Sequence, residues 1–293
     1  MAELLDEASE LASAGVKELI VIAQDITRYG TDFNGEHQLP ALLRELCKLD
    51  FHWIRLHYLY PDEITEELID TIAEEKKIVS YLDIPIQHCN DGILKAMNRR
   101  DTKESLRKVF HELRERVPGL VLRTSIIAGL PGDTVAGFEH SLRQAIALDP
   151  ENITVHTLTL KRASRIVIED QKENDYADVA AMLEKCHLLA EAGYRPYYLY
   201  RQKNTLQNLE NVGWCKPGHE GYYNIYIMEE VQTILSAGAG GSTKLVADGG
   251  KRMQRIFNFK YPTEYIQRFA EVLERKKGVA EFYDHNLGTE TTG

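Results

Sequence analysis

VLRTSIIAGLPGDT, residues 121–134, is the stretch that indicates the fold most clearly. It opens with an apolar strand candidate, VLRTSIIA, one of five such runs in the first half of the chain. Several of these runs are nearly continuously apolar, which is typical of parallel strands covered on both faces. Glycines and a proline then end the run in a turn. Four similar runs begin near Leu19, Ile54, Tyr81 and Ile153. Their spacing of about 30 to 40 residues is the length of one βα unit.

The segments between these runs have the periodicity of helices. Thr65 is placed to cap a helix whose face carries Leu68 and Ile72, because a threonine side chain accepts from the first free amides of a helix. Asp101 and Glu104 have the spacing of a capping box for the next helix. Alternating strands and helices predict a (β/α) barrel, closed or partial, with its active site at the carboxyl ends of the strands.

The regular alternation of predicted strands and helices ends after about residue 160. We expect a helix over residues 179–189, a short aromatic strand over residues 197–200 and a polar loop over residues 201–225. We therefore predict three regions, which are a partial barrel over residues 1–160, a C-terminal α+β region over 161–283 and a disordered tail over 284–293.

The composition is that of a globular protein, with 43% hydrophobic and 27% charged residues. No run approaches the roughly 18 apolar residues needed to cross a bilayer. The amino terminus lacks the features of a secretory signal, and the four cysteines show no regular spacing, so we expect a cytoplasmic location. The net charge of −10 argues against non-specific binding to a nucleic-acid backbone.

Four ordered segments of the first half point to a known family. They are KELIVIAQDITRYGTD (17–32), WIRLHYLYPDEIT (53–65), DIPIQHCNDGILKAMNRR (83–100) and LRTSIIAGLPGDT (122–134). In these segments the chain, from residue 1 to about 138, resembles the radical-SAM methylthiotransferases that act on ribosomal protein S12. The resemblance implies S-adenosyl-L-methionine (SAM) as cofactor, ribosomal protein S12 as partner, and a partial (β/α)6 TIM-like barrel that here lacks its first strand.

Residues from about 139 onward carry a different resemblance. The segments are SLRQAIALDPENITVHTLTLKRAS (141–164), PYYLYRQKN (196–204), NVGWCKPGHEGYYNIYIMEE (211–230) and TILSAGAGGSTK (233–244). They are similar to oxygen-independent coproporphyrinogen III oxidases of the coproporphyrinogen dehydrogenase branch, which implies coproporphyrinogen III as substrate. The join falls at the GLPG element, which both families use, and we interpret the chain as a hybrid of the two.

The methylthiotransferase resemblance also implies a [4Fe–4S] cluster bound by a C-x3-C-x2-C triplet. The 293 residues lack this triplet, and Cys89 has no Cys or His partner at ligand spacing, so we assign no metal ligand. We therefore expect a radical-SAM core of methylthiotransferase type that is inactive without its cluster. The alternatives are an enzyme of haem biosynthesis that resembles coproporphyrinogen III oxidase, and a non-catalytic module that binds SAM or a tetrapyrrole.

Polar residues that follow the predicted strands are the candidates for SAM binding. Gln24, Asp25, Tyr29 and Gly30 come directly after the run at Leu19. They are suited to hydrogen bonds with the amino and carboxylate groups of a methionine moiety. The same residue types also form ordinary β–α turns, which is the alternative interpretation.

Five further candidates for the SAM site follow or line later strands. Gln87 and His88 follow the strand that begins near Tyr81, and His88 is either an acid–base or cofactor contact or a hydrogen-bonded structural histidine. Arg123 and Ser125 alternate along the strand that ends at Gly129. A buried Arg123 needs an anionic partner, either the SAM carboxylate or a structural aspartate. Gly129 allows the backbone to pass close to an adenine or ribose.

The second resemblance implies a substrate site in the C-terminal half. Arg201 is suited to pair with a substrate carboxylate, or else it belongs to a solvated basic face. The glycine cluster at residues 238–242 either binds a ligand through its amides or forms a tight structural loop. The candidate substrate-binding residues are Tyr198, Arg201, Asn204, Gly238, Gly240 and Ser242.

Overall fold

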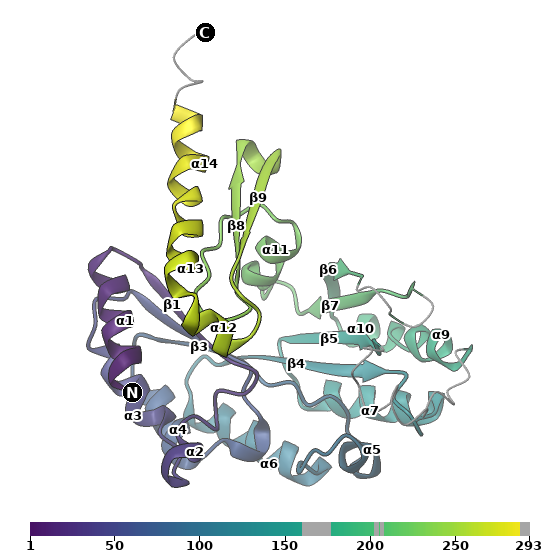
Figure 1. The fold of residues 1–293 in the computed structure, drawn as a ribbon. Coiled ribbons are helices and arrows are strands. Elements are labelled where there is room, and N and C mark those ends of the chain that lie inside the picture. Colours follow the sequence, from purple (N-terminus) through teal and green to yellow (C-terminus); the bar gives the residue numbers. More distant parts are fainter. Residues whose placement is uncertain (160–176, 202–204, 206–207, 288–293) are drawn as a thin grey trace. The chain divides into compact units, whose positions relative to one another are not determined.

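The computed structural model describes residues 1–159, 177–201, 205 and 208–287, and the chain divides into two compact units, residues 1–220 and 221–293 (Figure 1). The elements of the first unit are α1 (Ala2–Ser13), β1 (Glu18–Ile22), α2 (Thr31–Asn34), α3 (Leu39–Cys47), β2 (Trp53–His57), η1 (Pro61–Glu63), α4 (Glu66–Glu74), β3 (Ile78–Asp83), α5 (Asp91–Ala96), α6 (Lys103–Arg116), β4 (Val121–Ala128), α7 (Val135–Ala147), β5 (Asn152–Thr157), α9 (Ala177–Glu184), α10 (His187–Glu191), β6 (Arg195–Tyr200) and β7 (Asn211–Cys215). Those of the second are α11 (Tyr222–Met228), β8 (Ser242–Ala247), η3 (Asp248–Gly250), β9 (Arg252–Phe257), α12 (Pro262–Gln267), α13 (Phe269–Lys276) and α14 (Gly278–Leu287).

Seven strands of the described first unit form one sheet, in the order β1-β2-β3-β4-β5-β7-β6. Strands β1 to β5 are parallel, β7 is antiparallel to β5, and β6 is antiparallel to β7. The five apolar runs of the sequence are the five parallel strands. The described sheet is open, with β1 and β6 at its edges, which confirms the expectation of a partial barrel. Strands from both halves of the predicted hybrid share this sheet.

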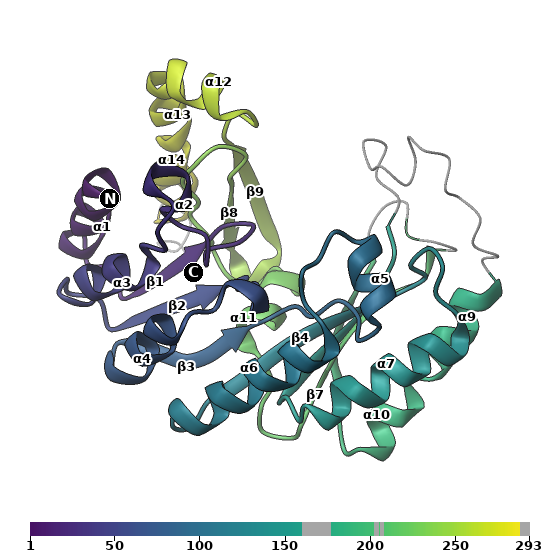
Figure 2. The same cartoon turned by 90° about the horizontal axis from the view of Figure 1, so that it is seen from below.

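The two faces of the sheet differ in polarity because side chains alternate along each strand. On the outer face Leu82, Leu122 and Val155 are almost completely buried. Helices α4, α6 and α7 lie along this face (Figure 2), and Phe110 of α6 and Phe138 of α7 belong to the same apolar core. The inner face carries the polar residues that are described below.

Helix starts follow local capping chemistry, with one correction to the sequence interpretation. Thr65 caps α4 as predicted, since its hydroxyl accepts from the amide three residues on (3.2 Å). The predicted pair of Asp101 and Glu104 does not cap α6. The capping box consists instead of Thr102 and Ser105, one residue later. Asp101 is 3% exposed and lies in the loop before the helix, so its side chain is buried rather than used as a cap.

Strand β7 contradicts the predicted loop over residues 201–225. Asn211 and Gly213 have low strand propensity and suggested a loop. Val212 and Trp214 nevertheless line a cavity beside the outer face, and β7 is hydrogen-bonded to β5 and β6 on its two sides. Tertiary pairing therefore outweighs local propensity here. The first compact unit consequently extends beyond the boundary at residue 160 that the sequence rhythm suggested.

The second unit is built around the antiparallel pair β8–β9, in which Ser242 pairs with Phe257. Its buried apolar side chains include Leu245, Ile256, Phe259 and Val272. Helix α14 continues to Leu287, so residues 284–287, which we expected in a disordered tail, are helical. None of the helices in the described part of the chain combines the length and apolar character that spanning a bilayer requires.

Candidate functional site

The loops that follow β1 and β2 are joined to the end of β3 by backbone hydrogen bonds. The Ile26 amide donates to the Tyr58 carbonyl (3.2 Å), and the Leu59 amide donates to the Asp83 carbonyl (3.1 Å). Asp83 is the last residue of β3 and pairs in register with Arg123 of β4. Because β4 is the longer strand, Arg123 lies level with the end of β3. The carboxyl ends of the first three strands and the middle of β4 thus form one continuous edge.

The loop after β1 has the hydrogen bonds of a β–α turn, but the hydroxyl of Tyr29 in this loop has no partner among the described residues. Asp25 accepts from the Thr27 amide (3.0 Å) and pairs with Arg28 (3.2 Å), while Gln24 is exposed. Gly30 has φ 93°, and a Cβ atom there would lie 2.5 Å from a side-chain carbon of Gln38, so only glycine fits. The buried Tyr29 hydroxyl has no hydrogen-bond partner among the described residues.

Gln87 continues β3 along the edge of β4. Its amide donates to the Ser125 carbonyl (2.8 Å), and its carbonyl accepts from the Ile127 amide (2.9 Å). These bonds pair Gln87 with Ile126 of β4, and Gln87 has a left-handed conformation, φ 67°. Its place in a SAM site stays a prediction. Within the described part of the chain its buried side-chain oxygen Oε1 has no partner. Gly129, at φ 88°, follows the end of β4.

His88 is fully buried and hydrogen-bonded at both ring nitrogens. The Asn90 amide donates to Nδ1 (3.0 Å), so the ring proton lies on Nε2, which donates to Asp133 (3.0 Å). The Ser141 hydroxyl of α7 is 3.2 Å from Nδ1. The geometry therefore favours the structural interpretation of His88 over a cofactor contact.

Arg123 is the centre of a buried network on the inner face. Its Nη1 donates to Asp83 of β3, and its Nη2 donates to Thr154 of β5 (3.0 Å) and to the Tyr198 hydroxyl of β6 (3.1 Å). The anion that Arg123 requires is thus supplied by Asp83, the structural alternative of the sequence interpretation. The Nε atom of Arg123 has no partner among the described residues.

The network shifts the ionisation of two buried groups. Burial alone would raise the pKa of Asp83, but the Arg123 guanidinium and His57, 3.7 Å away, outweigh burial and lower that pKa. Burial and the charge of Arg123 lower the pKa of His156 to about 4. His156, whose Nδ1 is 3.2 Å from the Tyr200 hydroxyl, is therefore neutral near pH 7, while Asp83 is ionised.

Sequence reasoning missed several residues of this inner face, among them His57, Tyr58, Thr154 and His156. A signal for three of them was present in the sequence. Polar side chains alternate with apolar ones along β2 and β5, where His57 follows Leu56 and where Thr154 and His156 flank Val155. This period of two places the polar residues together on one face.

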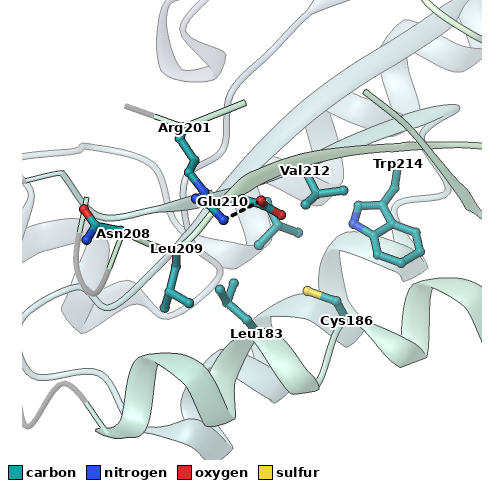
Figure 3. Close-up of a pocket in the computed structure, with 9 residues that line it drawn as sticks. Leu183, Cys186, Arg201, Asn208, Leu209, Glu210, Val212 and Trp214 are labelled. Carbon is teal, nitrogen blue, oxygen red and sulfur yellow. Dashed lines mark hydrogen bonds and ion pairs between the residues drawn. The ribbon is translucent and has the colours of Figure 1, made fainter. Parts of the chain in front are cut away.

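Tyr198 and Arg201 point to different sides of the sheet, although the sequence interpretation grouped them. Tyr198 reaches the inner network, whereas Arg201 lines a cavity of ≈ 480 Å³ whose walls include Val155 and Trp214 of the outer face (Figure 3). Arg201 is exposed and paired with Glu210 (2.9 Å). Asn204, the third candidate of this segment, lies outside the described residues.

The glycine cluster of the second unit uses its amides internally. The Gly238 amide donates to the Tyr265 hydroxyl (3.2 Å), the Gly240 amide to the Phe259 carbonyl (2.7 Å), and the Gly241 amide to the Gly238 carbonyl (3.3 Å). Ser242, at the start of β8, is half-buried. The geometry thus favours a tight structural loop, and a substrate role for these residues stays a prediction.

The cysteines of this chain do not fit an iron–sulfur cluster. Cys47, Cys89 and Cys215 are buried, Cys186 is half-buried, and all four are free thiols. Burial raises the pKa of Cys47, Cys89 and Cys186 to about 12 and that of Cys215 to about 11, which opposes the thiolate form that binds metal. Nowhere in the described ranges do three potential His, Cys, Asp or Glu ligands gather.

Comparisons by sequence match the first half of the chain. The Radical SAM superfamily profile matches residues 1–145. Ribosomal protein uS12 methylthiotransferase RimO of Alkaliphilus oremlandii is 49% identical over 140 residues, covering 47% of this chain and 32% of that protein. RimO of Lachnoclostridium phytofermentans is 53% identical over 135 residues, covering 46% of this chain and 31% of that protein. The matched segment thus spans about a third of the length of these relatives.

A solved structure covers most of the chain. Coproporphyrinogen III oxidase HemN from Escherichia coli, a radical SAM enzyme, superimposes with a TM-score of 0.62 over 92% of this chain and 61% of that protein, at 18% identity. At this identity the likeness concerns the fold. It supports a mostly parallel, partial-barrel architecture across both halves. The N-terminal half of the chain is thus similar in sequence to radical SAM proteins, and the whole chain is similar to one in fold.

Proposed function

We propose that the first unit binds SAM along the edge formed by the carboxyl ends of β1 and β3 and by β4, as a radical-SAM core of methylthiotransferase type. One observation carries the proposal. The Tyr29 hydroxyl, Gln87 Oε1 and Arg123 Nε are buried on these elements and have no hydrogen-bond partner among the described residues. Most buried polar atoms in proteins have a hydrogen-bond partner, and a ligand at this edge would supply one to each of these three atoms.

The three atoms match the chemistry of SAM. Arg123 Nε–H is a donor for a carboxylate or ribose oxygen, Gln87 Oε1 is an acceptor for an amine or hydroxyl, and the Tyr29 hydroxyl serves as either. Arg123 enters the site with its charge already balanced by Asp83, so it contributes a directed hydrogen bond more than net charge. The position at the carboxyl ends of parallel strands agrees with where barrel enzymes bind their ligands.

We further propose that these 293 residues bind SAM without radical chemistry. A [4Fe–4S] cluster supplies the electron that cleaves SAM in this superfamily, and the four cysteines present do not fit such a cluster. Ribosomal protein uS12 and coproporphyrinogen III are the substrates named for the similar proteins. In the described part of the chain Arg201 is occupied by Glu210 on the outer side, which does not favour the tetrapyrrole alternative.

The test is calorimetric titration of SAM against the chain and two glutamine variants. We expect Gln87→Ala to weaken binding about tenfold, the effect of losing one hydrogen bond of ~1.4 kcal/mol. Gln144→Ala on the outer helix α7 is the matched control and should bind like the unmodified chain. Absence of SAM binding by the unmodified chain would refute the proposal.

A second experiment tests the proposal that these residues carry out no radical chemistry. Incubation of the chain with iron and sulfide should give no absorbance of a four-iron cluster, and reductive cleavage of SAM by the incubated chain would refute this second proposal.

A further inference from the structure

Tyr198 spans several strands to reach Arg123. It lies on β6 and pairs with Gly213 of β7, which in turn pairs with Thr154 of β5. Its hydroxyl is 3.0 Å from the Thr154 hydroxyl and 3.1 Å from Arg123 Nη2 on β4. Side chains normally stand upright on a sheet, so a ring that lies across two neighbouring strands needs space beneath it.

Gly213 provides that space. A Cβ atom at this position would lie 1.9 Å from Cε1 of the Tyr198 ring and 2.4 Å from Cδ1, which no side chain tolerates. The backbone of Gly213 is extended and does not need glycine for its conformation. The absence of a side chain at Gly213 is therefore explained by the path of Tyr198 over β7.

The hydroxyl of Tyr198 completes the anchoring of the Arg123 guanidinium. Nη1 donates to Asp83, and the two N–H bonds of Nη2 are directed to Thr154 and Tyr198. A planar guanidinium held at both terminal nitrogens cannot rotate freely about its Cδ–Nε bond. Nε is buried and is the one guanidinium nitrogen of Arg123 without a partner among the described residues.

We propose that Tyr198 is a positioning residue for ligand binding, which fixes Arg123 so that its Nε–H is presented to SAM; this rests on the proposed function. The residue belongs to the half that resembles coproporphyrinogen III oxidases, whereas Asp83 and Arg123 belong to the half that matches the methylthiotransferases. The C-terminal strands thus complete a ligand site that the radical SAM domain begins.

The neighbouring Tyr200 offers a matched control. It lies on the same strand, stacks at 6.3 Å from the Tyr198 ring, and its hydroxyl bonds to His156 and not to Arg123. Tyr198→Phe and Tyr200→Phe each remove one hydrogen-bonded hydroxyl and keep the ring. In calorimetric titration with SAM we expect Tyr198→Phe to bind about three- to tenfold more weakly, and Tyr200→Phe to remain within about twofold of the unmodified chain.

A double-substitution cycle separates positioning from general stability. If Tyr198 acts through Arg123, adding Tyr198→Phe to Arg123→Lys should weaken SAM binding no further, because the group it positions is already lost. Equal affinities of the two tyrosine variants, or additive effects in the cycle, would overturn the positioning role and leave the proposed function intact. Failure of the unmodified chain to bind SAM would overturn the proposed function, and this inference with it.

Discussion

The inner and outer faces of the seven-stranded sheet are made by the same strands but serve different purposes. On the outer face Leu122 and Ile126 of β4 are fully buried against helices. On the inner face of the same strand Arg123 and Ser125 are also buried, yet Arg123 is held by hydrogen bonds to three other strands. One face therefore derives its stability from packing, while the other holds a polar network in which Arg123 Nε has no partner among the described residues.

The largest expected effect comes from breaking the inner ion pair. Arg123→Met should lower the free energy of unfolding of the first unit by about 3–5 kcal/mol, because Asp83 would remain as a buried charge without its counterion. Denaturation is followed by tryptophan fluorescence, since Trp53 and Trp214 both lie in residues 1–220.

The matched control is Arg55→Met. Arg55 pairs with Glu18 on the same face (2.6 Å) but is partly exposed, so its loss should cost under about 1 kcal/mol. The pH dependence adds a second check. Because the pKa of Asp83 is lowered by folding, the Asp83–Arg123 pair stabilises the fold above about pH 4, and this contribution is lost as the pH falls through the folded-state pKa. Equal destabilisation by Arg123→Met and Arg55→Met would contradict the claim that the buried Arg123–Asp83 pair matters more to stability than the partly exposed Arg55–Glu18 pair.

A second comparison uses adjacent positions of β4. Ile126→Ala should destabilise the first unit by about 2–5 kcal/mol, because it removes apolar packing and leaves a cavity. Ser125→Ala, on the inner face, should cost less than about 1 kcal/mol. Urea denaturation of both variants measures the difference. A larger cost for Ser125→Ala would show that the inner face is packed like the outer one.

The parallel strands were predictable from sequence because each of β1 to β5 lies in a largely apolar segment and these segments recur at the spacing of one βα unit. Strand β7 was not predictable. Its Gly213 lowers the local strand propensity, and the reason for this glycine is the ring of Tyr198 on β6, which passes over it. The sequence alone placed Gln87 after β3 and Arg123 on β4, and a common SAM site for them stays a prediction. The partner of Arg123 could not be chosen from sequence, since identifying Asp83 requires the register of β3 against β4.

Two buried aspartates sharpen the comparison further. Unlike Asp83, Asp101 lies outside the inner network, and its nearest cation, Arg99, is 3.8 Å away. Burial and then the neighbouring Asp62 raise the pKa of Asp101 to about 6. A raised carboxyl pKa destabilises the fold as the pH rises from about 4 to about 6, because the unfolded chain loses the proton first.

Asp101→Asn should therefore stabilise the first unit at pH 7 by about 1–3 kcal/mol. The gain should vanish below about pH 4, where both states of the unmodified chain are protonated. Thermal unfolding at pH 7.5 and pH 3.5, with fluorescence detection, gives the two values. A gain that does not depend on pH would show that the burial of the Asp101 charge is not its cause.

The central claim, that the inner edge and not the outer side binds SAM, is tested most directly by hydrogen–deuterium exchange with and without saturating SAM. We predict slower exchange in residues 24–30, 84–88 and 123–129, which follow or form the strand ends of the proposed site. Exchange in α9 and α10 and in residues 208–214, around the outer cavity of Figure 3, should be unchanged. Protection confined to the outer segments, with none at the strand ends, would contradict the account.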